Sequence, residues 1–287
     1  MSRVPRIFLT IVSHCLPIRV VTPFLLFILL FSPGSFSLQG QILPDYNWLR
    51  KVDLPTVSGS SLNTEDITIA IAHDRAGNIY TLTVGSGVDK RDPEGNLLQK
   101  AFIPGSRMDS PRDLVVDDEG LIYVADYLAA GDDFRDNGKI RVFDGTGNYL
   151  PEKTFFTSFY RPLGLDLSGD KVYVAEYYDG LQGPEIGSTF SRVRIYDKNS
   201  GSLLKESKQV DIPLRIAVNS TGRVYVSQAG AANPAVLIFD ENLNPSGQLP
   251  NITSPGSVLL DDLDFIHIIE YGNRIKFSEF INFDNLG

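Results

Sequence analysis

The sequence predicts an all-β protein, and three observations support this prediction. A block of two short β-rich runs joined by a polar turn recurs along the chain, most clearly in Pro111–Asp126, Pro213–Gln228 and Pro255–Glu270. Its copies are spaced by 42 to 52 residues. A third β-rich run, which ends in an acid, follows each copy. Units of this length with four antiparallel strands each are typical of the blades of a β-propeller.

The first two strands of each unit are recognised by apolar columns that recur at equivalent positions. The first-strand column is Ile71, Leu114, Leu165, Ile216 and Val258, and the second strands begin at Ile79, Ile122, Val172, Val224 and Ile266. The turn between them starts with Asp74, Asp117, Ser168, Asn219 or Asp261. Such residues bond to the backbone of their own turn, so we expect these side chains to be structural.

The third and fourth strands complete each unit. Ile140–Asp144 and Val193–Asp197 are third strands, and apolar runs such as Leu97–Phe102 and Leu203–Val210 follow after turn residues. Five units are visible in this way. The chain ends at Gly287, where the fourth strand of the last unit is expected.

The pattern P-x-x-[LIV]-x-[LIV]-[DN]-x-x-G-x-[IV]-Y-V-x-[DE], followed by [IV]-x-[VIF]-[FY]-D, resembles the NHL-repeat class of six-bladed, TolB-like propellers over about residues 60–280. The resemblance implies six blades, so we expect a C-terminally truncated ring. The alternative is a five-bladed ring in which Tyr46–Leu54 supplies a closing strand, which would remove exposed sheet edges. The class includes scaffolds, sugar-lactone hydrolases and lyases, so the resemblance implies an architecture rather than one function.

Residues 1–37 resemble a secretory signal peptide. Basic residues precede the apolar run Val20–Phe31, and Ser35–Ser37 forms a cleavage zone of small residues. An uncleaved membrane anchor at residues 7–31 is the alternative, but Arg19 interrupts the apolar run. We therefore predict a secreted or extracytoplasmic protein with a signal peptide at 1–37, a linker with the possible closing strand at 38–66, and propeller blades at 67–287.

Composition excludes several classes of function. The chain has 35 acidic and 26 basic residues, a net charge of −9, which argues against a nucleic-acid partner. The single cysteine, Cys15, rules out an intrachain disulfide and a cysteine-based metal cluster. Motifs for a nucleophilic serine, a zinc protease or a phosphate loop are missing, and the two histidines beyond the signal, His73 and His267, lie in predicted strands. We expect no catalytic residues.

A candidate ligand-binding face follows from the geometry of a propeller blade, where the first strand begins and the second strand ends on the same side of the ring. Its predicted residues are Asp126, Tyr127, Asp133, Asp136, Asp166, Glu176, Tyr177, Arg215 and Glu270. The four carboxylates Asp126, Asp166, Glu176 and Glu270 would be the calcium ligands if the site holds a metal. The competing interpretation is that the strand-end acids bond to neighbouring backbone and the loop acids are solvated.

Two residues of this face interrupt otherwise regular columns. Asp166 occupies a position that is apolar in the other units, and a buried acid is costly without a partner. Arg215, one unit further on, is its candidate partner, in either a structural ion pair or a site lining the channel. Arg112 and Arg161, near the starts of first strands, are expected to line the same opening.

Two functions remain open at this point. The first is a non-catalytic binding or scaffold module without a cofactor, which binds a protein, peptide or glycan on an acidic face that carries tyrosines. The alternative is a calcium-dependent hydrolase resembling the sugar lactonases, in which carboxylates hold the metal in the channel. Membrane contact is expected only through the N-terminal segment.

Overall fold

The computed structural model describes residues 68–127, 138–159, 161–177, 191–207, 210–229, 234–261, 264–270 and 274–277. These residues form five antiparallel sheets, four with four strands and one with three. Each sheet is a meander in which sequential strands pair. Apart from short 3-10 turns such as Gly105–Arg107, the described residues are strands and their connections.

The strand bounds follow the predicted units closely. The first sheet contains β1 (Thr68–His73), β2 (Ile79–Thr83), β3 (Gly87–Arg91) and β4 (Leu97–Pro104), and the second contains β5 (Pro111–Val116), β6 (Ile122–Asp126), β7 (Gly138–Phe143) and β8 (Phe155–Phe159). The third contains β9 (Arg161–Ser168), β10 (Lys171–Tyr177), β11 (Arg192–Asp197) and β12 (Leu203–Glu206). The fourth contains β13 (Pro213–Val218), β14 (Val224–Gln228), β15 (Ala235–Phe239) and β16 (Pro245–Gln248), and the fifth contains β17 (Pro255–Leu260), β18 (Ile266–Glu270) and β19 (Arg274–Phe277).

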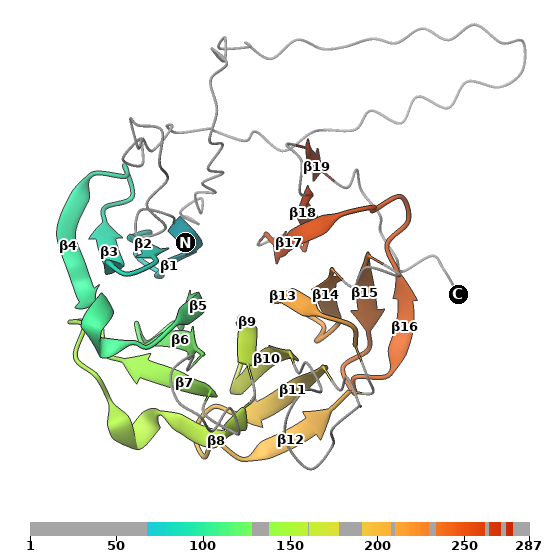
Figure 1. Cartoon of the computed structure of the whole chain (residues 1–287), viewed down its shortest axis with the longest axis horizontal. Helices are drawn as coiled ribbons and strands as arrows, with labels where there is room; N and C mark the ends of the chain where they lie inside the picture. The colour runs from blue at the N-terminus through green and yellow to red at the C-terminus, as the bar shows by residue number, and fades with distance from the viewer. Residues whose placement is uncertain are drawn as a thin grey trace, which may run out of the picture.

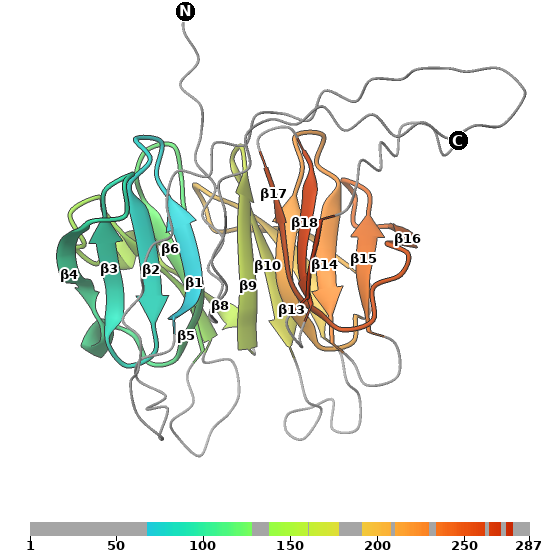
Figure 2. The same cartoon turned by 90° about the horizontal axis from the view of Figure 1, so that it is seen from above.

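The sheets are arranged as blades around one axis (Figure 1). The first strand of each sheet is innermost, and β1, β5, β9, β13 and β17 pack on one another in that order. Figure 2 shows these inner strands running along the axis. This layout confirms the predicted β-propeller, of which the described residues form five blades. The predicted signal peptide, the closing strand and a fourth strand of the last blade lie outside the described residues, and a sixth blade stays a prediction.

Four hydrophobic cores hold neighbouring blades together. Leu82 and Ile103 of the first blade pack with Leu114 and Val124 of the second, and equivalent clusters join the other adjacent blades. The apolar columns of the sequence therefore face the spaces between blades. Within the described part of the chain, no helix combines the length and the apolar character of a membrane span.

The turns between first and second strands confirm the structural role of their leading acids. The phenol of Tyr80 donates to Asp74 at 3.1 Å, and that of Tyr123 donates to Asp117 at 3.2 Å. In the fifth blade, Asp264 has a φ of 62° where other turns carry glycine. Its carboxylate accepts the backbone N–H of Ser220 at 3.0 Å, a bond that accompanies this left-handed conformation.

Candidate functional site

The strand-end acids of the predicted face bond to the backbone of their own blades. Asp126 is 1% exposed and accepts the N–H groups of Asp109 at 3.0 Å and Ser110 at 2.8 Å, as well as a bond from Arg141. Glu270 is 4% exposed and accepts the N–H of Thr253 at 2.7 Å. These carboxylates fasten the segment that leads into the first strand of the blade.

The equivalent side chains of the third and fourth blades are held in a similar way. Gln228 accepts the N–H of Asp211 at 2.9 Å, with the same sequence separation of 17 residues as Asp126 and Asp109. Glu176 is completely buried and pairs with Arg192 at 3.0 Å and Arg194 at 3.4 Å. Gln228 thus repeats the backbone bond of Asp126, and Glu176 repeats its pairing with an arginine.

The four carboxylates suggested as calcium ligands do not form a calcium site in this structure. Among the described residues, no group of three or more acidic, histidine or cysteine side chains is placed to hold a metal ion. Asp126, Glu176 and Glu270 direct their oxygens at backbone N–H groups or arginines, as described above. Calcium needs six to eight oxygen ligands from groups that converge, so this set does not fit it.

Asp166 joins two inner strands. One carboxylate oxygen accepts the N–H of Leu167 at 2.8 Å, and the other accepts the N–H of Val218 on β13 at 2.7 Å. Burial raises its pKa to about 7, and the negative charge of Asp113 acts in the same direction. Asp166, an acid in an otherwise apolar column, thus links the third and fourth blades through hydrogen bonds.

Asp113 makes the same kind of connection one blade earlier, and the sequence analysis did not single it out. Its carboxylate accepts the N–H of Leu114 at 3.0 Å and that of Leu165 on β9 at 3.0 Å. Burial raises the pKa of Asp113, whereas the charge of Arg215 lowers it. Nε of Arg215 lies 3.8 Å from this carboxylate. The predicted pair of Arg215 with Asp166 is therefore corrected: the carboxylate beside Arg215 is that of Asp113, because Asp166 is directed at backbone N–H groups.

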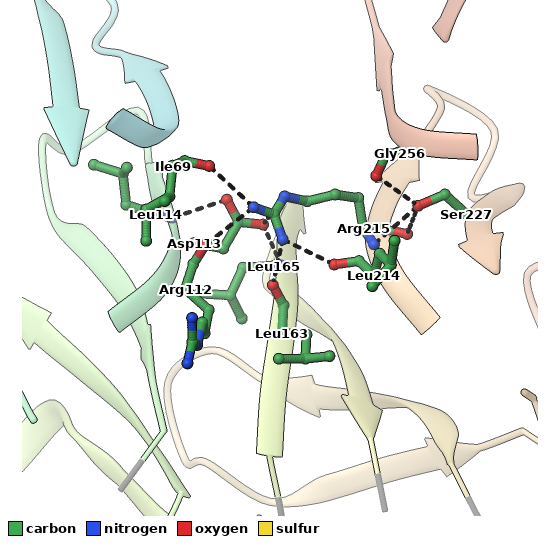
Figure 3. Close-up of polar contacts among 10 residues, drawn as sticks. All are labelled: Ile69, Arg112, Asp113, Leu114, Leu163, Leu165, Leu214, Arg215, Ser227 and Gly256. Atoms are coloured by element: carbon green, nitrogen blue, oxygen red, sulfur yellow. Dashed lines mark hydrogen bonds and ion pairs between the residues drawn. The ribbon is translucent and has the colours of Figure 1, made fainter. Parts of the chain in front are cut away.

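Arg215 spans the channel and connects four inner strands (Figure 3). Its guanidinium donates to the carbonyl oxygens of Ile69 on β1, Arg112 on β5, Leu163 on β9 and Leu214 on β13, at distances of 2.9 to 3.1 Å. The four carbonyl groups belong to four different blades. A single side chain thus satisfies polar backbone groups that face the channel, where strand partners are missing on the inner edge.

Gly164 allows β9 and β13 to approach one another at this point. A Cβ atom at Gly164 would lie 2.9 Å from Cα of Arg215 and 3.1 Å from the carbonyl oxygen of Leu214. Both are closer than an ordinary contact, so a side chain would push β13 away. The absence of a side chain keeps Arg215 within reach of the channel.

A pocket of about 310 Å³ lies beside Arg215, where first strands begin and second strands end. We call it the mouth pocket. Its lining residues are Ile69, Arg112, Tyr127, Arg161, Leu163, Tyr177, Leu214 and Arg215. The expectation that Arg112 and Arg161 line this opening is confirmed. Three arginines and no acid line it among the described residues, whereas the sequence analysis predicted an acidic face.

The two tyrosines of the mouth pocket lie against its arginines. The guanidinium of Arg161 is 5.1 Å from the centre of the Tyr127 ring and 5.6 Å from that of Tyr177. The guanidinium of Arg112 is 5.8 Å from the Tyr127 ring. Such cation–π contacts fix flat aromatic surfaces next to positive charge.

The structure brings only part of the predicted face together. Tyr127, Tyr177 and Arg215 share the mouth pocket. Asp126, Asp166, Glu176 and Glu270 do not line it. Asp133 and Asp136 lie outside the described residues. The sequence contained a signal for the positive pocket, because Arg112, Arg161 and Arg215 all occur within the first three residues of β5, β9 and β13.

Comparison with known proteins identifies the fold. No protein-family model and no curated protein sequence matches the chain. Solved structures do match it. A gluconolactonase from Xanthomonas campestris has a TM-score of 0.50 at 16% identity, covering 70% of this chain and 68% of that one. A nidogen/laminin complex has a TM-score of 0.53 at 12% identity, covering 72% and 73%. A protein of unknown function from Bacteroides caccae has a TM-score of 0.50 at 15% identity, covering 71% and 70%. The shared feature at these identities is the fold.

Proposed function

We propose that this protein is a non-catalytic binding module for a protein, peptide or glycan. A group of that ligand enters the mouth pocket. The observation that carries the proposal is the convergence of Arg112, Arg161 and Arg215 with the rings of Tyr127 and Tyr177 around one opening. Tyrosine and arginine are, with tryptophan, the residues enriched at binding hot spots. A rigid frame of inner strands holds them, because Arg215 itself fastens four blades.

The solved structures with a similar fold include both an enzyme and a protein in a binding complex. One similar structure is a complex of nidogen with laminin, and another is a gluconolactonase. The alternative function, a calcium-dependent hydrolase resembling the sugar lactonases, has that second neighbour in its favour. We favour the binding module because Asp126, Asp166, Glu176 and Glu270 are engaged by N–H groups and arginines.

We further propose that residues 1–37 are a signal peptide and that the protein is an exported NHL-like propeller, so that the proposed binding event takes place outside the cytoplasm. The acidic net charge of −9 is compatible with such a partner and argues against nucleic acid. The mouth pocket is then a local positive site on an otherwise acidic protein.

Peptide and glycan arrays, probed with the wild-type protein and with Tyr127→Ala and Tyr177→Ala, test the proposal. We expect a restricted set of array ligands for the wild type, and loss of that set in both variants with unchanged thermal unfolding. Arg75→Gln is the control, because Arg75 is exposed on the turn between β1 and β2, at the other end of the strands. Equal array profiles for the wild type and both tyrosine variants would show that the ligand binds elsewhere.

A further inference from the structure

We infer that the mouth pocket binds the anionic head group, a carboxylate or a phosphate, of a ligand of about monosaccharide size. This inference rests on the proposed function and specifies the chemistry of its ligand. It reverses the prediction of an acidic binding face.

The first argument is the balance of charge in the mouth pocket. Arg112, Arg161 and Arg215 contribute three positive charges to its lining, and no acid lines it among the described residues. Asp113, 3.8 Å from Arg215, offsets one of the three charges. The charge of Arg112 remains, because no carboxylate in the described part of the chain pairs with its guanidinium, although the overall charge of the chain is −9. A cleft lined by charges of one sign attracts ligands of the opposite sign.

The second argument is the hydrogen-bonding capacity of two of the arginines. A guanidinium has five N–H donors. Those of Arg215 are directed at four carbonyl groups and at Asp113, so this side chain supplies charge rather than free donors. The guanidinium of Arg112 has no hydrogen bond or ion pair within the described part of the chain. Figure 3 shows its side chain pointing away from the Arg215 guanidinium. Arg112 can thus donate two parallel bonds to an oxyanion.

The third argument is that Tyr127 orients this donor. The guanidinium groups of Arg112 and Arg161 lie 5.8 and 5.1 Å from the centre of its ring. Its backbone N–H donates to the carbonyl oxygen of Ser110 at 3.0 Å. This cation–π contact restricts the guanidinium of Arg112 before any ligand arrives, which lowers the entropy cost of binding. The rings of Tyr127 and Tyr177 also offer flat surfaces for the uncharged part of a ligand.

The fourth argument is size. The volume of about 310 Å³ is at the lower end of the range of small-molecule sites, roughly 300 to 1,000 Å³. The pocket thus accommodates a single ring with one charged group. A larger molecule would place only such an end group inside it.

Three probes with one ring scaffold test the inference: D-glucose, D-glucuronate and D-glucose 6-phosphate. Isothermal titration calorimetry with the full-length protein at low ionic strength compares them. We expect one or both charged probes to bind at least tenfold more tightly than glucose. The preferred probe distinguishes a carboxylate from a phosphate. Added sodium chloride should weaken the binding, since salt screens the attraction.

Variants locate the binding and separate it from folding. Arg112→Gln should lower the affinity for the charged probe about tenfold or more and leave the melting temperature nearly unchanged. Arg112→Lys should lower the affinity by an intermediate factor, because lysine keeps the charge but lacks the planar guanidinium. Arg75→Gln should bind as the wild type does.

Three results would overturn the inference: equal affinity for glucose and the charged probes, no binding of either charged probe below about 10 mM, or wild-type affinity in Arg112→Gln. If glucose binds as tightly as the charged probes and this binding is lost in Tyr127→Ala, the preference for an anion is contradicted. The proposed binding function would still stand. Array profiles that are the same for the wild type and for the tyrosine variants would contradict the proposed function itself.

Discussion

The side chain of Arg215 donates a 3.0 Å hydrogen bond to the backbone carbonyl of Ile69, which lies 146 residues earlier in the chain. This bond connects the fourth blade to the first across the channel. The same guanidinium reaches the second and third blades through Arg112 and Leu163. One of the three arginines that line the mouth pocket is therefore also the residue that links four blades.

Arg215→Gln should destabilise the fold by about 3 kcal/mol or more, because it leaves Asp113 as a buried charge without its cation and several carbonyls without donors. Urea unfolding measures this loss. The double variant Asp113→Asn/Arg215→Gln should regain part of it, since the uncompensated charge is removed. Additive losses in the double variant would contradict the coupling of the two side chains.

Gly164→Ala should destabilise the protein by about 1 to 3 kcal/mol, because the added methyl group would lie 2.9 Å from Cα of Arg215. Gly145→Ala is the matched control. A Cβ at Gly145 has its nearest neighbour at 3.5 Å, an ordinary contact, and the residue has no positive φ. Equal unfolding midpoints for the two variants would contradict the close packing of β9 on β13.

Stability should fall as pH rises from about 4 to 7 because of Asp166. Burial raises the pKa of this carboxyl from 3.8 to about 7, so within that window the folded protein holds a proton that the unfolded chain has lost. The folded state is then favoured at the acidic end of the window, and the advantage disappears as pH passes 7. Asp113, whose pKa burial also raises, acts with the same sign.

Urea unfolding at pH 5 and pH 8 measures this dependence. The loss of stability on going to pH 8 should be smaller in Asp166→Asn than in the wild type. Asp144→Asn is the control, because bonds from Thr146 and Asn148 lower the pKa of Asp144 to about 2, well below the range of the measurement. The same slope in all three proteins would rule out Asp166 as a group that titrates in this range.

Calcium should not stabilise the propeller through its strand-end acids. Thermal unfolding in excess calcium and in excess chelator should give the same melting temperature for the wild type. An increase with calcium that disappears in Asp126→Asn or Glu176→Gln would show that these carboxylates rearrange into a metal site. That outcome would revive the hydrolase alternative.

The fold was predictable because similar side chains recur at equivalent positions of the blades for local reasons. The turn acid Asp117 and the tyrosine six residues later, Tyr123, bond within one hairpin, so both residues are visible in the sequence as a recurring pair. From the second blade on, the column that contains Leu114 faces the preceding blade, as its members Leu165, Ile216 and Val258 also do. Local bonding and alternation leave a pattern at a fixed period.

The candidate site was predicted less well, because its chemistry depends on contacts between blades. Asp126 and Glu270 were placed at the correct end of the strands, but the sequence does not show that their oxygens turn toward backbone N–H groups. Asp113 occupies the same column as Arg215 and was not recognised as its neighbour. Gly164, on the inner strand β9 between them, leaves room for the backbone of Arg215.

The central claim is that the mouth pocket binds an anion through Arg112, and a crystal structure with the tighter of the two charged probes tests it most directly. The account predicts that the carboxylate or phosphate lies within hydrogen-bond distance of the Arg112 guanidinium, with the sugar ring against Tyr127 or Tyr177. A probe bound outside this pocket, or held through a metal ion by Asp126 or Glu176, would contradict it.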